Sequence, residues 1–206
     1  MGLGFIRGLK EVPMNTELKN TDLKKKMLVI DVESTCWRGK VPAGMTSEVI
    51  ELGYAILQEG EGVLEWGSFL ISPRRSEIST FCTELTTISA ETYVRESEKV
   101  VKREDLLAKL DDLTRRHGWH NFKSCQWGSW GDYDFKMLVK TFGEENLRKD
   151  NHTNIKKRHA AARGLEKALG MGQALTWEHL ELHGTHHRGG DDAYNIARIA
   201  RKVFGW

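Results

Sequence analysis

The first half of the chain alternates short apolar runs with turns, a pattern that predicts β-strands. Residues 27–33 (MLVIDVE) form an apolar run that becomes acidic at its end, as a buried central strand does where it opens into a site. Residues 49–57 and 63–71 predict two more strands, and the Glu-Gly-Glu-Gly sequence at 59–62 predicts the hairpin turn between them. We therefore expect the first three strands to form an antiparallel meander.

Helical periodicity dominates the remainder of the chain. Residues 103–117 carry leucines at positions 106, 107, 110 and 113, which predicts an amphipathic helix. The other predicted elements are a strand over 122–127, a helix over 133–142, an edge strand over 153–157, helices over 155–169 and 175–182, and a closing helix over 190–204. Together the elements predict one α/β domain with a mixed five-stranded sheet flanked by helices.

Composition is consistent with a single globular domain. The chain has 206 residues, of which 39% are hydrophobic and 29% charged. Its three scattered cysteines argue against a disulfide framework and against a cysteine zinc site, and they fit a reducing compartment. No apolar run approaches the roughly 18–20 residues that span a bilayer, and no secretory signal is visible. We expect a cytoplasmic protein with no membrane partner.

The N-terminal segment differs from the rest of the sequence. Residues 1–26 show no sustained period and end in a lysine run, so we expect a flexible extension there and a folded domain over 27–206. The net charge of +2 does not by itself indicate a nucleic-acid-binding protein. Local basic clusters exist, however, and the one at 156–159 is either a solvated surface or a contact for a phosphate backbone.

Two carboxylates end the first predicted strand. Side chains two positions apart on a strand point the same way, so Asp31 and Glu33 are expected to project together. Neighbouring carboxylates repel each other unless a cation lies between them, and oxygen ligands suit Mg²⁺ or Mn²⁺. A solvated strand end with a chance Asp-x-Glu is the alternative.

Two further acidic positions open predicted helices. Asp134 follows a glycine- and aromatic-rich turn, and Asp132 beside it could be the helix cap instead. Asp192 heads the buried face of the last helix, where a carboxylate is costly unless it is paired or bound to metal, whereas Asp191 fits a capping role. The nearby His183, His186 and His187 raise a competing idea, a histidine zinc site, although they lack the H-E-x-x-H spacing.

The order of these motifs is more specific than any one of them. An Asp-x-Glu strand, a Gly/aromatic-Asp turn and a His-x₄-Asp helix start resemble the DEDDh family of 3′→5′ exonucleases, over residues 27–204. The closest likeness is to the Eri-type branch, which includes the 3′ histone mRNA exonuclease. The supporting stretches are IDVESTCW (30–37), EVIELGYAIL (48–57), STFCTELTTIS (79–89), WGDYD (130–134) and HHRGGDDAYNIARIA (186–200).

The resemblance implies an RNase H-like fold and a two-metal exonuclease site. By this resemblance His187, in preference to His186, is the general base of the site, and the cofactors are two Mg²⁺ or Mn²⁺ ions. The implied metal ligands are Asp31, Glu33, Asp134 and Asp192. The implied activity is release of nucleoside monophosphates from the 3′ ends of RNA, with single-stranded DNA as a second substrate class. A catalytically silent nucleic-acid-binding module is the alternative, but all four carboxylates are present.

The resemblance also implies contacts to the terminal nucleotide. Phe81, Leu85 and Thr86 match the segment that packs against it, but Thr87 replaces the glycine usual after Leu-Thr. Aromatic faces bind exposed bases with little sequence preference. Trp37, in the loop after the acidic strand, is therefore expected to line the site. For Phe81 and Trp130 (at the Gly/aromatic turn), stacking on a base and packing in the core are equally expected.

Overall fold

Five strands form one mixed sheet in the order β3-β2-β1-β4-β5. The computed structural model describes residues 24–206. The first three strands are antiparallel, which confirms the predicted meander, and the last two run parallel to β1. The strands are β1 (Lys26–Ser34), β2 (Val49–Gln58), β3 (Gly62–Leu70), β4 (Trp127–Ser129) and β5 (His152–Asn154). The predicted α/β fold is confirmed.

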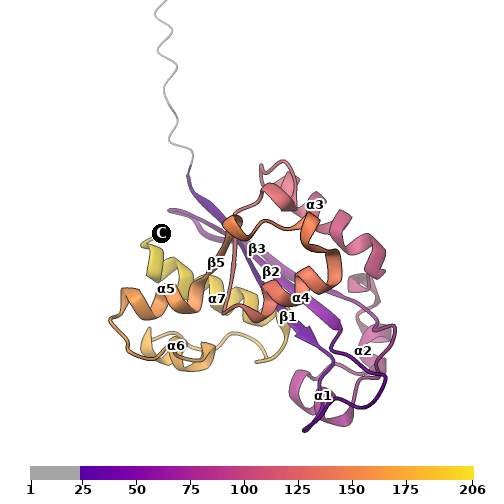
Figure 1. Ribbon diagram of the computed structural model, residues 1–206. Helices are drawn as coiled ribbons and strands as arrows, with labels where there is room; N and C mark the ends of the chain where they lie inside the picture. Colours follow the sequence, from indigo (N-terminus) through magenta and orange to yellow (C-terminus); the bar gives the residue numbers. More distant parts are fainter. Residues whose placement is uncertain (1–23) are drawn as a thin grey trace, which may run out of the picture.

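Helices cover both faces of this sheet (Figure 1). One face packs against α3 and α4, and the other packs against α5, α6 and α7. The helices are α1 (Thr80–Thr86), α2 (Ala90–Arg95), α3 (Leu106–Arg116), α4 (Tyr133–Phe142), α5 (Ile155–Ala162), α6 (Met171–Trp177) and α7 (Gly189–Phe204). Among the described residues no helix is long and apolar enough to cross a membrane.

Strand β1 is buried on both sides, and its alternation decides where its carboxylates point. Leu28 and Ile30 pack into the core beneath α3 and α4, whereas Met27 and Val29 pack into the core beneath α7. The same two-residue period continues past Val29, so the next odd positions, 31 and 33, face α7. The acidic end of β1 is thereby aimed at the N-terminal end of α7.

The prediction of a strand over 122–127 was wrong. Phe122–Ser124 form a 3₁₀ turn instead, and β4 begins only at Trp127. The side chain of Asn121 accepts a hydrogen bond from the Ser124 backbone N–H at 2.9 Å. Such a local cap offers the backbone an alternative to strand pairing.

Several other predicted boundaries shift for similar reasons. The edge strand predicted over 153–157 ends at Asn154, whose side chain accepts from the Lys157 N–H at 2.9 Å and starts α5. Helix α5 stops at Ala162 rather than 169, just before Gly164 with its φ of 63°. The helix predicted over 175–182 lies at Met171–Trp177. Helix α2 was not predicted.

The predicted N-terminal extension lies almost entirely outside the described residues. Residues 1–23 are not described, and Lys26 already belongs to β1, one position before the predicted start of the folded domain. The division of the chain at residue 27 therefore stays a prediction.

The start of α7 touches the middle of β2 at two glycines. A Cβ on Gly53 would overlap the carbonyl of Gly189, and a Cβ on Gly189 would lie 2.9 Å from the backbone nitrogen of Gly53. Only residues without side chains allow this approach. It brings the first turn of α7 against the acidic end of β1.

Gly53→Ala is therefore expected to destabilise the fold by about 3 kcal/mol or more, because α7 must move off the sheet. Gly172 in α6 is the matched control, since a Cβ there meets nothing within 4 Å. Gly172→Ala is expected to stabilise by about 0.5–1 kcal/mol, through the higher helix propensity of alanine. Chemical denaturation measures both changes, and equal midpoints for the two variants would contradict the close approach.

Candidate active site

Four carboxylates gather where the C-terminal end of β1 meets the starts of α4 and α7. Oxygen atoms of Asp31, Glu33 and Asp192 lie within 4.8 Å of one another. Asp134 joins them from the first turn of α4, where its Oδ1 accepts the Val32 backbone N–H at 3.0 Å. The structure thus brings together all four carboxylates that the sequence singled out as metal ligands.

This cluster is unfavourable when every member is charged. Burial, and next the charges of Asp134, Glu33 and Asp192, raise the pKa of Asp31 well above its ordinary value. Burial and the same kind of repulsion raise the pKa of Glu33 to about 9. Burial also raises the pKa values of Asp134 and Asp192. Divalent cations would relieve both effects, and the all-oxygen donor set fits Mg²⁺ or Mn²⁺.

The raised pKa of Glu33 predicts how stability depends on pH without metal. Between pH 7 and 8.5 the folded protein holds a proton on this carboxyl that the unfolded chain has released, so the free energy of unfolding is expected to fall with rising pH, by about 1 kcal/mol per pH unit. The lowered pKa values of His152 and His187 have the opposite effect, a rise in stability with pH, which acts mainly below pH 7 where the unfolded imidazoles are protonated.

Urea denaturation in EDTA at several pH values measures this dependence. Mg²⁺ is expected to flatten it, because the cation favours the ionised carboxylates. Glu33→Gln is expected to make it less steep without metal, with the remaining dependence carried by Asp31, whose pKa is also raised. Equal slopes for the wild type and Glu33→Gln in EDTA would show that the carboxyl does not carry the effect.

Two adjacent histidines border the cluster with different contacts. His187 Nδ1 lies 3.9 Å from Glu33 Oε1, and the neighbouring ring of His186 stacks on it at a centroid distance of 3.9 Å. His186 Nδ1 instead contacts Asp192 Oδ2 at 2.9 Å. Burial lowers the pKa of His187, and the charge of His186 adds to this effect. His187 is thus held largely in the neutral form that can accept a proton.

The third histidine of the competing zinc hypothesis lies elsewhere. The His183 ring packs against Trp66 and Tyr194, at centroid distances of 6.0 and 4.7 Å. Among residues 24–206 the metal-competent group that contains histidine is His186, His187 and Asp192. A site built from three histidines is therefore not formed.

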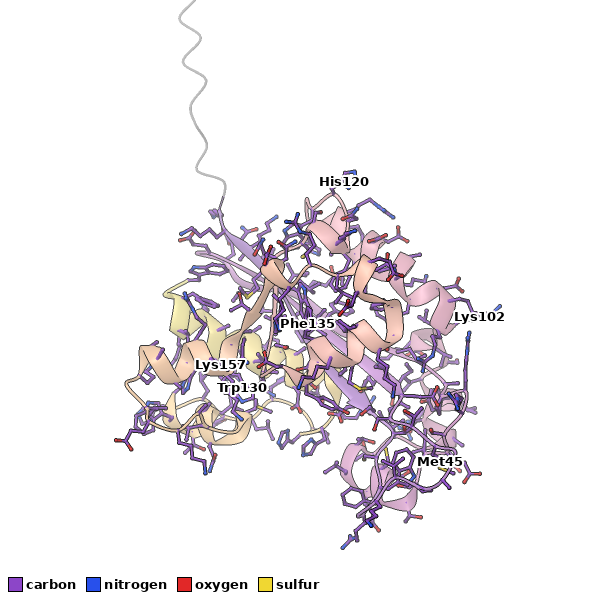
Figure 2. The ribbon with its side chains drawn as sticks, in the orientation of Figure 1. Met45, Lys102, His120, Trp130, Phe135 and Lys157 are labelled. Atoms are coloured by element: carbon purple, nitrogen blue, oxygen red, sulfur yellow. The ribbon has the colours of Figure 1, made fainter. Side chains whose placement is uncertain are left out.

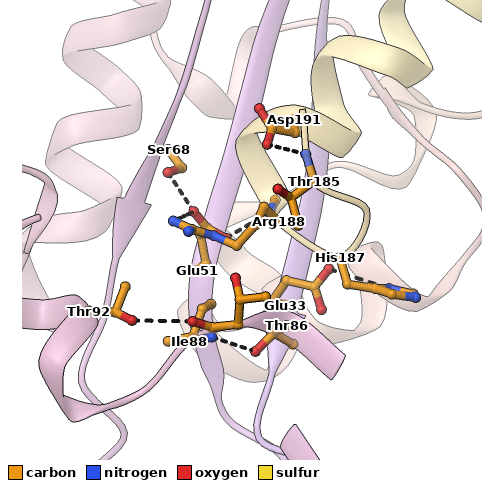
Figure 3. Close-up of polar contacts among 12 residues, drawn as sticks. Glu33, Glu51, Ser68, Thr86, Ile88, Thr92, Thr185, His187, Arg188 and Asp191 are labelled. Atoms are coloured by element: carbon orange, nitrogen blue, oxygen red, sulfur yellow. Dashed lines mark hydrogen bonds and ion pairs between the residues drawn. The ribbon is translucent and has the colours of Figure 1, made fainter. Parts of the chain in front are cut away.

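A buried ion pair that the sequence did not reveal holds the residue after His187 (Figure 3). Glu51, on β2 and 1% exposed, accepts from Arg188 Nε and Nη2 at 3.2 Å, and from the Gly189 backbone N–H at 2.8 Å. The second partner of Arg188 is Glu96, at 2.9 Å. The one sequence feature that could have indicated a buried partner for Glu51 is its position inside the apolar run VIELGYAIL. Its partner, 137 residues away, was not identifiable from local pattern.

Glu51→Gln is expected to lower the free energy of unfolding by about 3 kcal/mol, because the mostly buried Arg188 guanidinium loses one of its two carboxylate partners. It is also expected to reduce kcat, since Arg188 adjoins His187. The control is Glu61→Gln, which breaks an exposed ion pair with Lys24 and should change the unfolding midpoint little. If the two variants unfold alike, the buried pair does not anchor this loop.

The residues expected to contact the terminal nucleotide divide into two groups. Trp37, Phe81 and Leu85 are partly exposed near α1, and the guanidinium of Arg38 lies 5.4 Å from the Phe81 ring centroid. The Ser79 hydroxyl donates to the Cys36 carbonyl at 2.6 Å and so ties the loop after β1 to the start of α1. The side chains of Trp37, Phe81 and Leu85 therefore remain accessible to a ligand.

Thr86 and Trp130 are engaged within the fold. Thr86 is buried, and its hydroxyl donates to the Cys82 carbonyl at 2.8 Å. The Trp130 indole packs against the core beneath α7 and donates to the Leu169 carbonyl at 3.2 Å (Figure 2 shows its place). For Trp130 the contacts favour core packing over stacking. Thr87 ends α1 with φ of 60°, a left-handed conformation that favours glycine.

The mixed sheet, its flanking helices and the acidic end of β1 define the protein as one of RNase H-like fold. The sequence profile of the RNase T family of exonucleases matches residues 28–200. The chain therefore belongs to this exonuclease family and is a nuclease. The family resemblance inferred from the motifs is confirmed, and no curated protein matches the sequence.

Solved structures agree with the fold at low sequence identity. The nuclease domain of 3′hExo, a DEDDh family member bound to rAMP, is 22% identical with a TM-score of 0.74, over 89% of this chain and 94% of that one. A full-length 3′-exonuclease gives 21% and 0.74, over 88% of this chain but only 61% of its own length. S. pombe Pop2p with Mg²⁺ and Mn²⁺ bound is 17% identical with a TM-score of 0.60, over 86% of this chain and 82% of that one.

Proposed function

We propose that this chain is a 3′→5′ exonuclease that uses two divalent cations, Mg²⁺ or Mn²⁺, to release nucleoside monophosphates from the 3′ ends of RNA. Single-stranded DNA is the second substrate class. The observation that carries the proposal is the mostly buried cluster of Asp31, Glu33 and Asp192, completed by Asp134. Carboxyls with these raised pKa values lower the free energy of unfolding in the absence of metal. Their retention at one place is explained if they bind catalytic cations.

The four carboxylates would hold two cations. Asp31, whose pKa is raised by the charges of the other three, would be a ligand common to both. Glu33 and Asp192 would complete one site, and Asp134 would serve the other. When bound, two cations stabilise charge on the phosphoryl and leaving oxygens and lower the pKa of water. The Pop2p structure was solved with Mg²⁺ and Mn²⁺, which supports the choice of ions.

His187 is assigned the proton transfer. Its imidazole borders the cluster beside Glu33, and its lowered pKa leaves a nitrogen free to take the proton of the attacking water at neutral pH. Gly189 and Gly190 follow within three residues, and the backbone at His187 is left-handed, with φ of 65°. The ion pair between Arg188 and Glu51 of β2 anchors the chain immediately after His187.

RNA is the favoured substrate by analogy. The related nuclease domain of 3′hExo was solved with rAMP, and another neighbour recognises the 3′ end of a histone mRNA stem-loop. Trp37, Phe81 and Leu85 offer apolar surface for a terminal base. Each of these points supports a nucleotide at this site.

The experiment compares metals on one RNA oligonucleotide. Cleavage to nucleoside monophosphates is expected with Mg²⁺ or Mn²⁺ and is expected to stop in EDTA. RNA binding without any cleavage would favour the silent binding module, and activity with Zn²⁺ alone would favour the zinc hydrolase.

A further inference from the structure

A groove of about 890 Å³ lies at the end of α7 opposite the carboxylate cluster. The start of β1, the edge strand β5, helix α5 and the end of α7 form its walls. None of the site residues named above lines the groove, and helix α7 has 16 residues, so the end of the groove at Phe204 lies about 24 Å from the first turn of that helix. The groove is therefore separate from the site described above.

Positive charge is concentrated in this groove. Lys25, Lys157 and Arg158 line it, and no acidic side chain of the described residues does. The whole chain carries a net charge of only +2, so the charges are unevenly distributed. Neither Lys25 nor Arg158 forms an ion pair within residues 24–206. The basic cluster at 156–159, left open by the sequence, thus takes part in a shaped cationic surface.

Aromatic rings form part of the same surface. The rings of Phe204 and Trp206 lie 5.3 Å apart and both line the groove. The Arg158 guanidinium lies 5.7 Å from the Phe204 ring centroid. Cationic side chains beside aromatic faces are the combination that binds single-stranded nucleic acid, because phosphates meet the charges and bases stack on the rings.

One contact links the groove to the active-site side of the sheet. Lys157 Nζ lies 3.2 Å from Asp132 Oδ2, and Asp132 is two residues from Asp134. Trp130 lies in the turn that leads to Asp132, and its ring centroid is 5.7 Å from that of His159, which belongs to the same helix as Lys157. A strand that left the carboxylate cluster along this turn would meet the groove at Lys157.

We propose that this groove binds the backbone and bases of a single-stranded nucleic acid several nucleotides upstream of the 3′ end. The proposal that the groove is a binding site depends only on its own cationic and aromatic side chains. Its place upstream of a cleaved end rests on the proposed function. The groove then gives longer strands higher affinity than strands too short to reach it.

The test measures binding in EDTA, where cleavage is blocked, by fluorescence anisotropy with labelled RNAs of about four and about sixteen nucleotides. The variant is Lys25→Gln with Arg158→Gln, and the matched control is Lys102→Gln with Lys109→Gln. These control lysines are exposed, and Lys102 lies far from Lys157 in Figure 2. Thermal melts verify that both double variants fold.

The groove variant is expected to lose about tenfold or more in affinity for the long RNA at low salt. The slope of log K against log salt is expected to fall by about 1.4, for two lost phosphate contacts at roughly 0.7 each. The control is expected to match the wild type. A groove variant that binds the long RNA like the control would overturn the proposal, whether or not the wild type cleaves RNA. A wild type that binds but does not cleave with Mg²⁺ or Mn²⁺ would overturn only the proposed function.

Discussion

His187→Ala is expected to lower kcat by about 10²–10⁴-fold, the usual contribution of a general base. RNA binding in the presence of metal is expected to persist, because the alanine removes none of the four carboxylates. The structural reason is the position of the imidazole, with Nδ1 3.9 Å from Glu33 Oε1 and burial favouring its neutral form. Single-turnover cleavage and a separate anisotropy titration measure the two effects.

His186→Ala is the matched control for this substitution. The two rings stack on each other, but His186 contacts Asp192 rather than Glu33. Its loss is therefore expected to change the metal concentration needed for half-maximal activity more than the rate at saturating metal. Retention of the acidic limb of the pH–rate profile in His187→Ala, or unchanged turnover, would exclude His187 as the base.

Asp31→Asn is expected to reduce activity by about 10³-fold or more, because several kcal/mol of charge stabilisation depend on the cations that this carboxylate would bridge. The same substitution is expected to raise the melting temperature in EDTA. At neutral pH the Asp31 carboxyl is destabilising without metal, since burial and the charges of the neighbouring carboxylates raise its pKa. Activity and metal-free stability should thus change in opposite directions.

Differential scanning fluorimetry with and without Mg²⁺ measures the stability effect. Mg²⁺ is expected to raise the wild-type melting temperature and to leave that of Asp31→Asn nearly unchanged. Asp112→Asn, on the exposed surface of α3, is the control and should retain activity and the response to metal. A loss of stability in EDTA for Asp31→Asn would contradict the electrostatic account of this cluster.

The parts of the site that the sequence predicted depend on local geometry or on motif spacing. Asp31 and Glu33 follow from the two-residue period of a strand, which the structure preserves as far as Glu33. Asp134 and Asp192 were preferred over their acidic neighbours by family spacing, and the structure places both in first helical turns beside β1. For these four carboxylates the sequence pattern and the structure agree on where the side chains lie.

Other features depend on contacts between distant segments. In the sequence Glu51 is only one polar residue in an apolar strand. Its role depends on the ion pair with Arg188, which directly precedes α7. The burial of Thr86 and the hydrogen bond from Trp130 to Leu169 likewise depend on how α1 and the segment before α6 pack. The prediction of a strand over 122–127 was wrong because of a local contact. The side chain of Asn121 stabilises a turn there, and the apolar pattern does not reveal that turn.

The polarity of digestion tests the central proposal most directly. A single-stranded RNA labelled at its 5′ end is incubated with Mn²⁺ or Mg²⁺, and a circular RNA of the same sequence is incubated in parallel. The 5′-labelled strand is expected to yield a ladder that shortens one nucleotide at a time while the circular RNA stays intact. Internal cuts in the circular RNA would contradict a 3′→5′ exonuclease.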